Sequence, residues 1–147
     1  MRIVTIKSKS LKQYTEDKEM LQKASRPCVL VIRLRYKENR YDFAVPLRSN
    51  IAPSTPKTQY FALPPRSTTK DGYRHGIHYA KMFPVNKDSL IRFRTEGNES
   101  AERIKRIIDA NEKEIIKECQ DYLDEYAKGN IPKYATDIDW MLTLLKE

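Results

Sequence analysis

Glycine, histidine and cysteine are all scarce in this chain of 147 residues, and each shortage excludes a class of site. Its four glycines form no Gly-rich phosphate loop, and neither the P-loop nor the dinucleotide-binding pattern occurs. The two histidines, His75 and His78, have no carboxylate pair at ligand spacing, and CxxC is absent. We therefore expect neither a metal site nor a cofactor.

Other signatures are missing as well. There is no GxSxG nucleophile elbow, and the front of the chain is too poor in acids for a glycosidase pair. No charged and apolar leader opens the chain, and no apolar run approaches the roughly 18 residues of a membrane span. These absences predict a cytoplasmic protein without a membrane partner. Cys28 and Cys119 are expected to be small buried hydrophobes.

The positive charge is concentrated in the first two thirds of the chain. Residues 1–97 hold 20 Lys and Arg against 8 Asp and Glu, a balance of +12. Residues 98–147 hold 8 against 12, a balance of −4, so that the sum is the net charge of +8. A basic segment joined to an acidic one favours a polyanion-binding surface on one part of the molecule. A soluble basic protein without a nucleic-acid partner has the same composition.

Short apolar runs predict a series of strands. Residues 28–36 carry apolar side chains on both faces, which indicates a central strand. Residues 37–40 are predicted to form a hairpin turn. The other predicted strands cover residues 2–6, 41–47, 58–63 and 76–80, with a ragged continuation over 82–85, and 90–94.

Helical patterns flank these strands. Ser8 or Ser10 is predicted to cap a helix that runs to about residue 24. Isoleucines and aromatic residues recur at three- and four-residue steps from Asn98 or Ser100 to Gly129, which predicts one long helix packed on the sheet.

Thr136 is predicted to cap a final helix. The order of elements predicts one α+β domain over residues 1–147, with a basic β-rich part (1–97) and a helical tail (98–147). Its centre would be a small, strongly bent antiparallel sheet or barrel, packed by an N-terminal helix and C-terminal helices.

The segment 41–50 is the most informative part of the chain. Apolar side chains at 41, 43 and 45 share one face, and Pro46 is expected to end the strand's pairing. Arg48, Ser49 and Asn50 would then lie at the strand's tip. A cation beside a hydroxyl at the end of a rigid strand can hold a phosphate.

Cleavage of RNA by its own 2′-hydroxyl suits these residues, because the substrate supplies the nucleophile. The protein must align the 2′-oxygen, neutralise phosphoryl charge and assist proton movement. Arg48 is the first candidate for the charge role and Arg26 the second, because a guanidinium bonds two phosphate oxygens at once. Ser49 is a candidate hydrogen-bonding group. His78 is a candidate acid or base because its charge can change near pH 7, although a satisfied, partly buried histidine fits equally well.

Aromatic residues, among them Tyr60, Tyr73 and Tyr79, interleave with the cations. Most should belong to the core, and one or two could be exposed to stack on unpaired bases, which is worth ~1–3 kcal/mol per base. Some of the cations, such as Lys81, could equally be ordinary solvated side chains. The candidate RNA-binding residues are Lys7, Lys9, Asn50, Lys57, Arg66, Lys70, Arg74 and Lys81.

Four pieces in this order resemble the endoribonuclease toxins of type III toxin–antitoxin systems, the ToxN/AbiQ/CptN family. They are the opening strand with residues 5–8, Arg26 and Pro27 before an apolar strand, residues 45–49 (Val-Pro-Leu-Arg-Ser), and residues 76–85 (Gly-Ile-His-Tyr-Ala-Lys-Met-Phe-Pro-Val). The resemblance covers about residues 1–90 and extends to the helical tail only in general character.

The resemblance implies a metal-independent endoribonuclease with a bent-barrel fold, whose products carry 2′,3′-cyclic phosphate and 5′-hydroxyl ends. The family's central serine falls on Ser49 and its basic residue before the second strand on Arg26. This chain has Arg48 where relatives carry threonine, and Ile51 where some carry lysine. Candidates to replace that lysine are Arg48, Lys57 and Lys81.

The resemblance also implies the partners. A small repeated antitoxin RNA, folded as a pseudoknot, would bind grooves of the toxin and close with it into a ring-like hetero-oligomer. The toxin would process this RNA and cut cellular or phage mRNA, which implies phage resistance through abortive infection. The basic front segment would bind the RNA with a steep salt dependence.

Two other functions remain open. A non-catalytic RNA-binding module would have the same basic face and aromatic residues but no turnover. A structural interaction protein would use its acidic helices to bind a protein partner, and neutralising the basic loop from Arg66 to Arg74 would leave its function intact.

Overall fold

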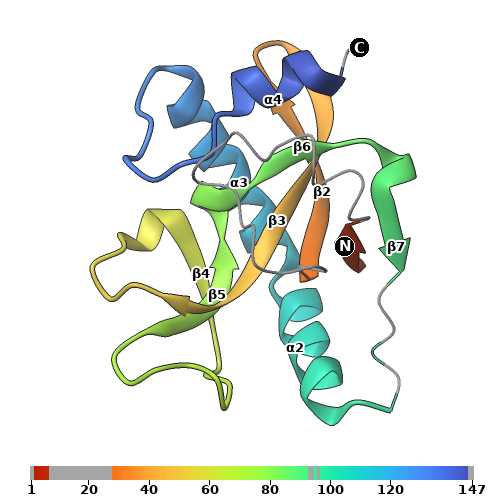
Figure 1. Cartoon of the computed structure of the whole chain (residues 1–147), viewed down its shortest axis with the longest axis vertical. Coiled ribbons are helices and arrows are strands. Elements are labelled where there is room, and N and C mark those ends of the chain that lie inside the picture. Colours follow the sequence, from red (N-terminus) through yellow and green to blue (C-terminus); the bar gives the residue numbers. More distant parts are fainter. Residues whose placement is uncertain (1, 7–27, 93–94, 96, 146–147) are drawn as a thin grey trace.

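A computed structural model describes residues 2–6, 28–92, 95 and 97–145 (Figure 1). The predicted helix up to residue 24, and the predicted site residues Lys7, Lys9 and Arg26, lie outside these ranges. The strands are β1 (Arg2–Ile6), β2 (Cys28–Tyr36), β3 (Asn39–Ile51), β4 (Tyr60–Leu63), β5 (Arg74–His78), β6 (Phe83–Val85) and β7 (Leu90–Arg92). The helices are α2 (Glu99–Ala110), α3 (Glu112–Ala127) and α4 (Ile138–Leu145), with 3-10 turns η1 (Lys57–Gln59), η2 (Tyr79–Lys81) and η3 (Lys87–Ser89).

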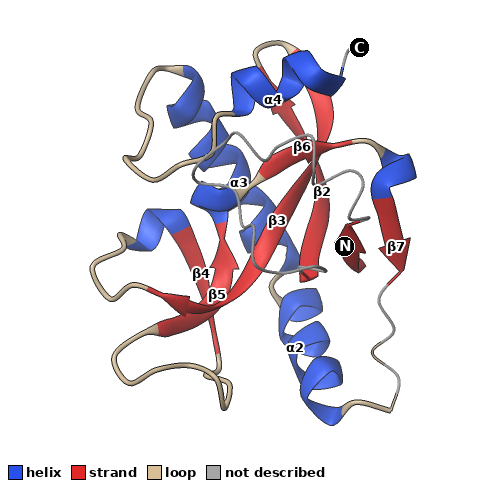
Figure 2. Ribbon diagram, in the orientation of Figure 1, coloured by secondary structure: helices blue, strands red, loops and turns tan. Residues whose placement is uncertain are grey.

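The strands form one seven-stranded antiparallel sheet in the order β4-β5-β3-β2-β1-β7, and β6 pairs with β3 outside this path. The α+β prediction is confirmed, and of the two predicted forms the described strands make an open sheet rather than a closed barrel. The predicted central strand 28–36 is β2, which lies between β1 and β3. Figure 2 shows the sheet with α2 and α3 on one side and α4 across its upper end.

Strand β3 is longer than predicted, because Pro46 does not end its pairing. Pro46 pairs with Val29 of β2, and from Leu47 onward β3 pairs with β5 instead. On the edge that β5 and β6 share, the described pairs stop at Ala44 and resume at Leu47. Pro46 therefore lies where no neighbour on that edge needs its missing N–H.

The hairpin between β2 and β3 is also tighter than predicted. Its turn consists of Lys37 and Glu38, with φ angles of 48° and 72°. Asn39 already belongs to β3. Two consecutive positive φ angles are the geometry whose twist matches that of the flanking strands.

Apolar side chains cover both faces of the sheet. The helix-side core combines alternate residues of β2 and β3 with α3, which confirms that the isoleucine stripe packs on the sheet and that Cys119 is buried. Its central members are Leu30, Ile32, Leu34, Phe43, Val45, Ile115, Cys119 and Leu123. The opposite core contains Val4, Ile6, Val29, Ala44, Phe83, Val85 and Met141 of α4.

The predicted long helix is two helices, α2 and α3, divided at Asn111. The Asn111 side-chain amide donates to the carbonyl of Ile107 (2.7 Å), and its backbone N–H lies near the same oxygen (3.2 Å). Asparagine competes in this way with regular helical bonding, and a helix interior tolerates it poorly. The two ends agree with the sequence: Asn98 accepts from Ala101 N–H (3.0 Å), and Gly129 has a φ of +98°.

The final helix is capped by Asp137 rather than by the predicted Thr136. The Asp137 carboxylate accepts from the backbone N–H of Trp140 (3.1 Å). Thr136 has another role: its hydroxyl donates to the carbonyl of Met82, and its N–H donates to that of Ala80 (3.1 Å). The segment before α4 is thereby attached to η2 and β6.

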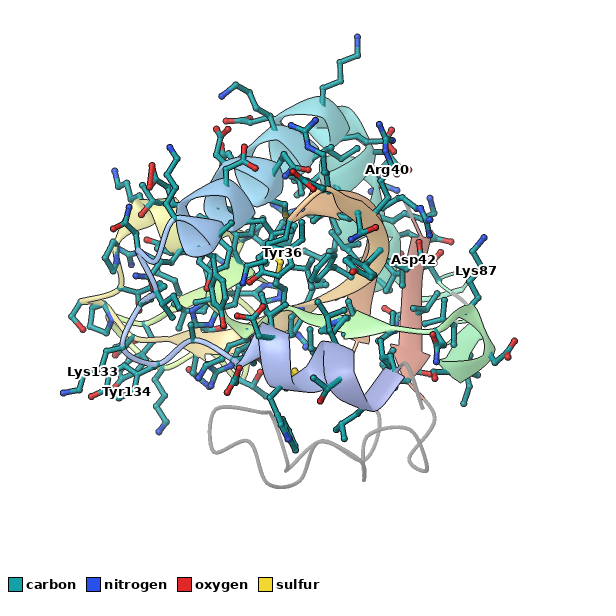
Figure 3. The ribbon with its side chains drawn as sticks, turned by 90° about the horizontal axis from the view of Figure 1, so that it is seen from above. Tyr36, Arg40, Asp42, Lys87, Lys133 and Tyr134 are labelled. Atoms are coloured by element: carbon teal, nitrogen blue, oxygen red, sulfur yellow. The ribbon has the colours of Figure 1, made fainter. Side chains whose placement is uncertain are left out.

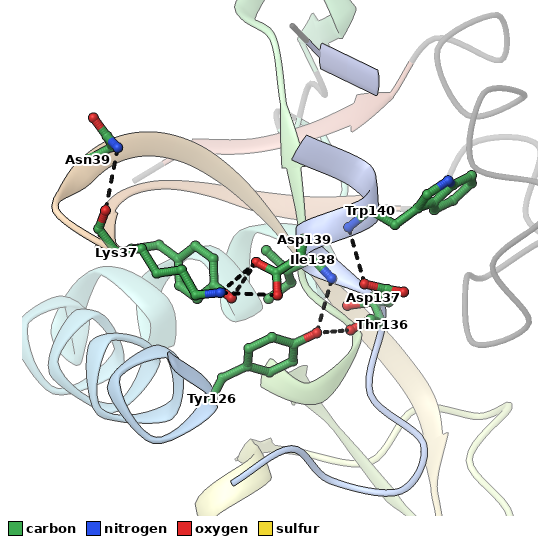
Figure 4. A network of polar contacts seen from close by, with 9 residues as sticks. Lys37, Asn39, Tyr126, Thr136, Asp137, Ile138, Asp139 and Trp140 are labelled. Carbon is green, nitrogen blue, oxygen red and sulfur yellow. Dashed lines mark hydrogen bonds and ion pairs between the residues drawn. The ribbon is translucent and has the colours of Figure 1, made fainter. Parts of the chain in front are cut away.

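Tyr126 completes this attachment (Figure 4). Its hydroxyl donates to Thr136 O (2.8 Å) and accepts from Ile138 N–H (3.1 Å). At the start of α4, Asp139 accepts from the Tyr36 hydroxyl (2.8 Å) and from Lys37 Nζ (3.1 Å). The C-terminal segment is therefore fixed to α3, to the β2–β3 hairpin and to η2.

Candidate functional site

Ser49 and Asn50 lie in a bulge of β3. Arg48 pairs with Gly76 and Ile51 pairs with Arg74, so that the two bulge residues face a single residue, His75, on β5. A bulge bends its strand and re-aims a side chain, and bulges are over-represented beside active sites. The predicted trio therefore lies inside a paired strand rather than at a free tip, and its three side chains are half-buried.

Arg48 is held by His78. Because Gly76 is two residues from His78 on β5, the two side chains lie on the same face of the sheet, and Arg48 Nη1 is 3.3 Å from His78 Nδ1. A guanidinium can only donate, so Nδ1 is the acceptor and the ring proton belongs to Nε2. Burial lowers the pKa of Arg48, although a guanidinium stays protonated in proteins. The result is a positioned cation beside the bulge.

His78 is neutral at physiological pH. It is 6% exposed, and burial together with the charges of Arg48 and Lys81 lowers its pKa to about 3. Such a low pKa does not agree with a charge change near pH 7, and the acid or base role of His78 stays a prediction. What the ring does is accept the Arg48 hydrogen bond. The sequence could not show this, because the burial of His78 comes from tertiary packing.

Lys81 is not a solvent-facing cation. It is buried in η2, and its Nζ donates to the carbonyl oxygen of Tyr134 (2.7 Å). Lys81 thus connects the end of the η2 turn to the loop before α4. Its long side chain holds that loop near His78, which is a structural role that its position in the sequence did not indicate.

Asn50 connects the bulge to the loop before β5. Its Oδ1 accepts from Lys70 N–H (2.7 Å), and its Nδ2 donates to Thr68 O (3.1 Å). In the same loop Arg66 N–H donates to the Thr69 hydroxyl (3.0 Å). The side-chain amide of Asn50 is thus occupied in fixing the loop. The three cations predicted there to bind RNA, Arg66, Lys70 and Arg74, are exposed.

Lys57 lies apart from this group. It belongs to η1, on the wall of a groove of about 770 Å³ between η1 and α3. The same groove is lined by Glu118, Asp121 and Glu125. The surroundings of Lys57 are therefore acidic.

Gly76 has a role that no sequence motif indicated. A Cβ atom at this position would lie well inside contact distance of the carbonyl oxygen of Phe61. Only glycine lets β4 approach β5 so closely beside Arg48. An isolated glycine in a strand is the signal that could have indicated this close approach.

Neither a metal-binding cluster nor a membrane-spanning helix occurs in the described ranges. They contain no group of three or more His, Cys, Asp or Glu residues placed to hold a metal ion. Within the same ranges, no helix combines the length and the apolar character needed to cross a bilayer.

The fold is shared with two solved structures. One is a protein from a bacterial antiviral system that a processed non-coding RNA regulates; its TM-score is 0.73 at 15% identity, over 97% of this chain and 96% of that chain. The other is AbiQ, a lactococcal anti-phage endoribonuclease belonging to the type-III toxin–antitoxin system. Its TM-score is 0.71 at 11% identity, and the match covers 97% of this chain and 93% of AbiQ. No protein-family model and no curated protein matches the sequence. At these identities the likeness establishes the fold, and it agrees with the family resemblance of the sequence.

Proposed function

We propose that this protein is the endoribonuclease toxin of a type III toxin–antitoxin system and cuts RNA without a metal ion. The proposal rests on one observation. The guanidinium of Arg48 bonds the neutral ring of His78 and lies beside the bulge that contains Ser49. The fold supports it, because AbiQ, described as an anti-phage endoribonuclease, has the same fold over nearly the whole chain.

In the proposed reaction the 2′-oxygen of the ribose attacks the adjacent phosphorus atom. The bond from phosphorus to the 5′-oxygen breaks, the 2′-hydroxyl loses its proton and the leaving 5′-oxygen gains one, so that the products are a 2′,3′-cyclic phosphate and a 5′-hydroxyl. Arg48 neutralises the charge that develops on the phosphoryl oxygens, where a fixed cation acts most strongly. Ser49 hydrogen-bonds the 2′-hydroxyl or a phosphate oxygen. Arg26 is proposed as a second phosphate contact.

The positive charge of the front segment and the family resemblance of the sequence support the proposed partners. A repeated pseudoknot RNA would inhibit the toxin, be processed by it and close with it into a hetero-oligomer, and cellular or phage mRNA would be the substrate. Lys7, Lys9, Arg66, Lys70 and Arg74 are proposed RNA contacts. Since phosphate contacts release counterions, binding should weaken steeply as salt is raised.

The test is cleavage of RNA by the purified protein in EDTA, with mapping of both fragment ends. We expect cyclic phosphate and 5′-hydroxyl ends in the wild type. Removal of one charge-stabilising donor typically costs about 100- to 1000-fold in rate, which is the loss expected for Arg48→Ala. Ser49→Ala should also lower the rate and relieve growth inhibition on expression. Lys87→Ala is the matched control, because Lys87 is an exposed cation in η3.

Loss of activity on chelation would reject the metal-free mechanism. A second candidate function, a non-catalytic RNA-binding module, is favoured by one observation: His78 is neutral and its Nδ1 already accepts from Arg48. In that case RNA would stay intact with the wild type, while Arg48→Ala would still weaken its binding.

A further inference from the structure

Two exposed tyrosines each lie beneath a lysine. Tyr73 is 39% exposed with Lys70 Nζ 5.9 Å from its ring centroid, and Tyr134 is 61% exposed with Lys133 Nζ 5.3 Å from its ring. An exposed cation–π pair of this kind is worth about 0.5–1 kcal/mol. Each pair presents an exposed aromatic surface with a positive charge beside it.

Both tyrosines belong to loops that residues of the candidate site hold in place. The loop of Tyr73 is fixed by Asn50, the neighbour of Ser49, through Lys70 N–H (2.7 Å). The loop of Tyr134 is fixed by Lys81, whose Nζ donates to the Tyr134 carbonyl itself (2.7 Å). Asn50 and Lys81, both predicted to bind RNA, therefore use their side chains to hold these two loops.

The loops lie at opposite ends of β5. Tyr73 directly precedes the strand, whereas Lys81 ends the η2 turn that follows it. Arg48 pairs with Gly76 at the middle of the strand. A strand of this length spans roughly 15 Å at about 3.4 Å per residue, so Arg48 pairs with β5 at a point between the attachments of the two loops.

The views of the whole molecule agree with this arrangement. In Figure 1 the loop between β4 and β5 lies below that pair of strands, and the loop between α3 and α4 lies above it. In Figure 3 Lys133 and Tyr134 project from one edge of the molecule, and Lys87 projects from the opposite edge.

We propose that bases on the two sides of the scissile phosphate stack on Tyr73 and Tyr134. This inference rests on the proposed ribonuclease function and makes the substrate a single strand, since bases paired in a helix are already stacked. Lys70 and Lys133 would contact the adjoining phosphates. Asn50 and Lys81 are then positioning residues that set the distance of each base from Arg48.

The experiment measures binding of a fluorescein-labelled 2′-O-methyl oligoadenylate, which cannot be cut by 2′-oxygen attack, together with cleavage of total RNA. We expect Tyr73→Ala and Tyr134→Ala each to raise Kd by roughly 5- to 150-fold, the worth of one base–ring stack. Tyr73→Phe and Tyr134→Phe should bind like the wild type, since they keep the ring. An oligomer of abasic ribose phosphates should bind more weakly and should not respond to the alanine variants. Lys87→Ala is again the control.

The two proposals fail separately. Suppose that the wild type cuts RNA but the alanine variants bind the oligoadenylate with unchanged Kd, or that their Kd rises by the same factor for the abasic oligomer. In either case the stacking inference is wrong and the ribonuclease remains. If the variants bind as expected but total RNA stays intact, the stacking surfaces stand and the ribonuclease is rejected. A wild type that does not bind the oligoadenylate rejects the stacking inference, and the cleavage of total RNA still decides the ribonuclease.

Discussion

Replacing His78 by glutamine should make the protein less sensitive to acid. In the folded protein burial, Arg48 and Lys81 lower the pKa of His78 from 6.5 to about 3. As the pH falls below 6.5, the unfolded chain binds a proton at this residue and the folded protein does not. Acid therefore favours the unfolded state, and stability is lost with falling pH until the folded pKa is reached.

The size of the effect follows from the interval between the two pKa values. At about pH 4.5 the unfolded histidine is two pH units below its pKa while the folded one is still neutral. Each unit is worth about 1.4 kcal/mol, so His78 alone should remove about 3 kcal/mol of stability between about pH 7.5 and pH 4.5. A glutamine cannot titrate, and its side-chain oxygen can still accept the hydrogen bond from Arg48.

The measurement is urea unfolding of wild type and His78→Gln at both pH values. For each protein we compare the unfolding free energy at the two pH values and take the difference. Any destabilisation that the substitution causes at both pH values cancels in this difference. Every other group is common to the two proteins, so its contribution cancels in this comparison. We expect the wild type to lose about 3 kcal/mol more than the variant. Equal losses in the two proteins would show that His78 titrates normally and that its contact with Arg48 is not as described.

Two further substitutions test the packing around the site. Gly76→Ala places a methyl group against the carbonyl of Phe61, so we expect a loss of about 1–3 kcal/mol in urea unfolding; wild-type stability would mean that β4 and β5 are not in close contact. Tyr126→Phe removes the hydroxyl that bonds Thr136 O and Ile138 N–H, both buried, and should cost about 1–3 kcal/mol; a neutral effect by the same measurement would contradict those bonds.

The sequence predicted best where a local pattern decides the structure. The bounds of β1 and β2 agree with the prediction, because the β-branched and apolar residues there favour a strand. Gly129 ended α3 as predicted, since its positive φ is a local property. The predictions at Pro46, Asn111 and Thr136 were wrong. At Pro46 and Thr136 the outcome depended on a neighbour that the local pattern does not contain, β5 beside Leu47 and Met82 opposite Thr136. At Asn111 it depended on a bond of the residue's own side chain to the carbonyl of Ile107.

The site was predictable in part for the same reason. A cation and a hydroxyl in adjacent positions, Arg48 and Ser49, were visible in the sequence, and their roles remain predictions. The contact between Arg48 and His78 depends on the register of two strands distant in the chain. The tethering roles of Asn50 and Lys81 depend on loops whose conformation no pattern of residues specified.

The change of partner along β3 bears on the order in which the molecule assembles. The first half of β3 joins β2 across a two-residue turn, a loop whose closure costs little chain entropy. Its second half pairs with β5, which is separated from β3 by residues 52–73. Contacts between distant segments generally form late in folding. A newly made chain should thus form this hairpin well before the bulge that contains Ser49 and Asn50 can be framed by its pairs with β5.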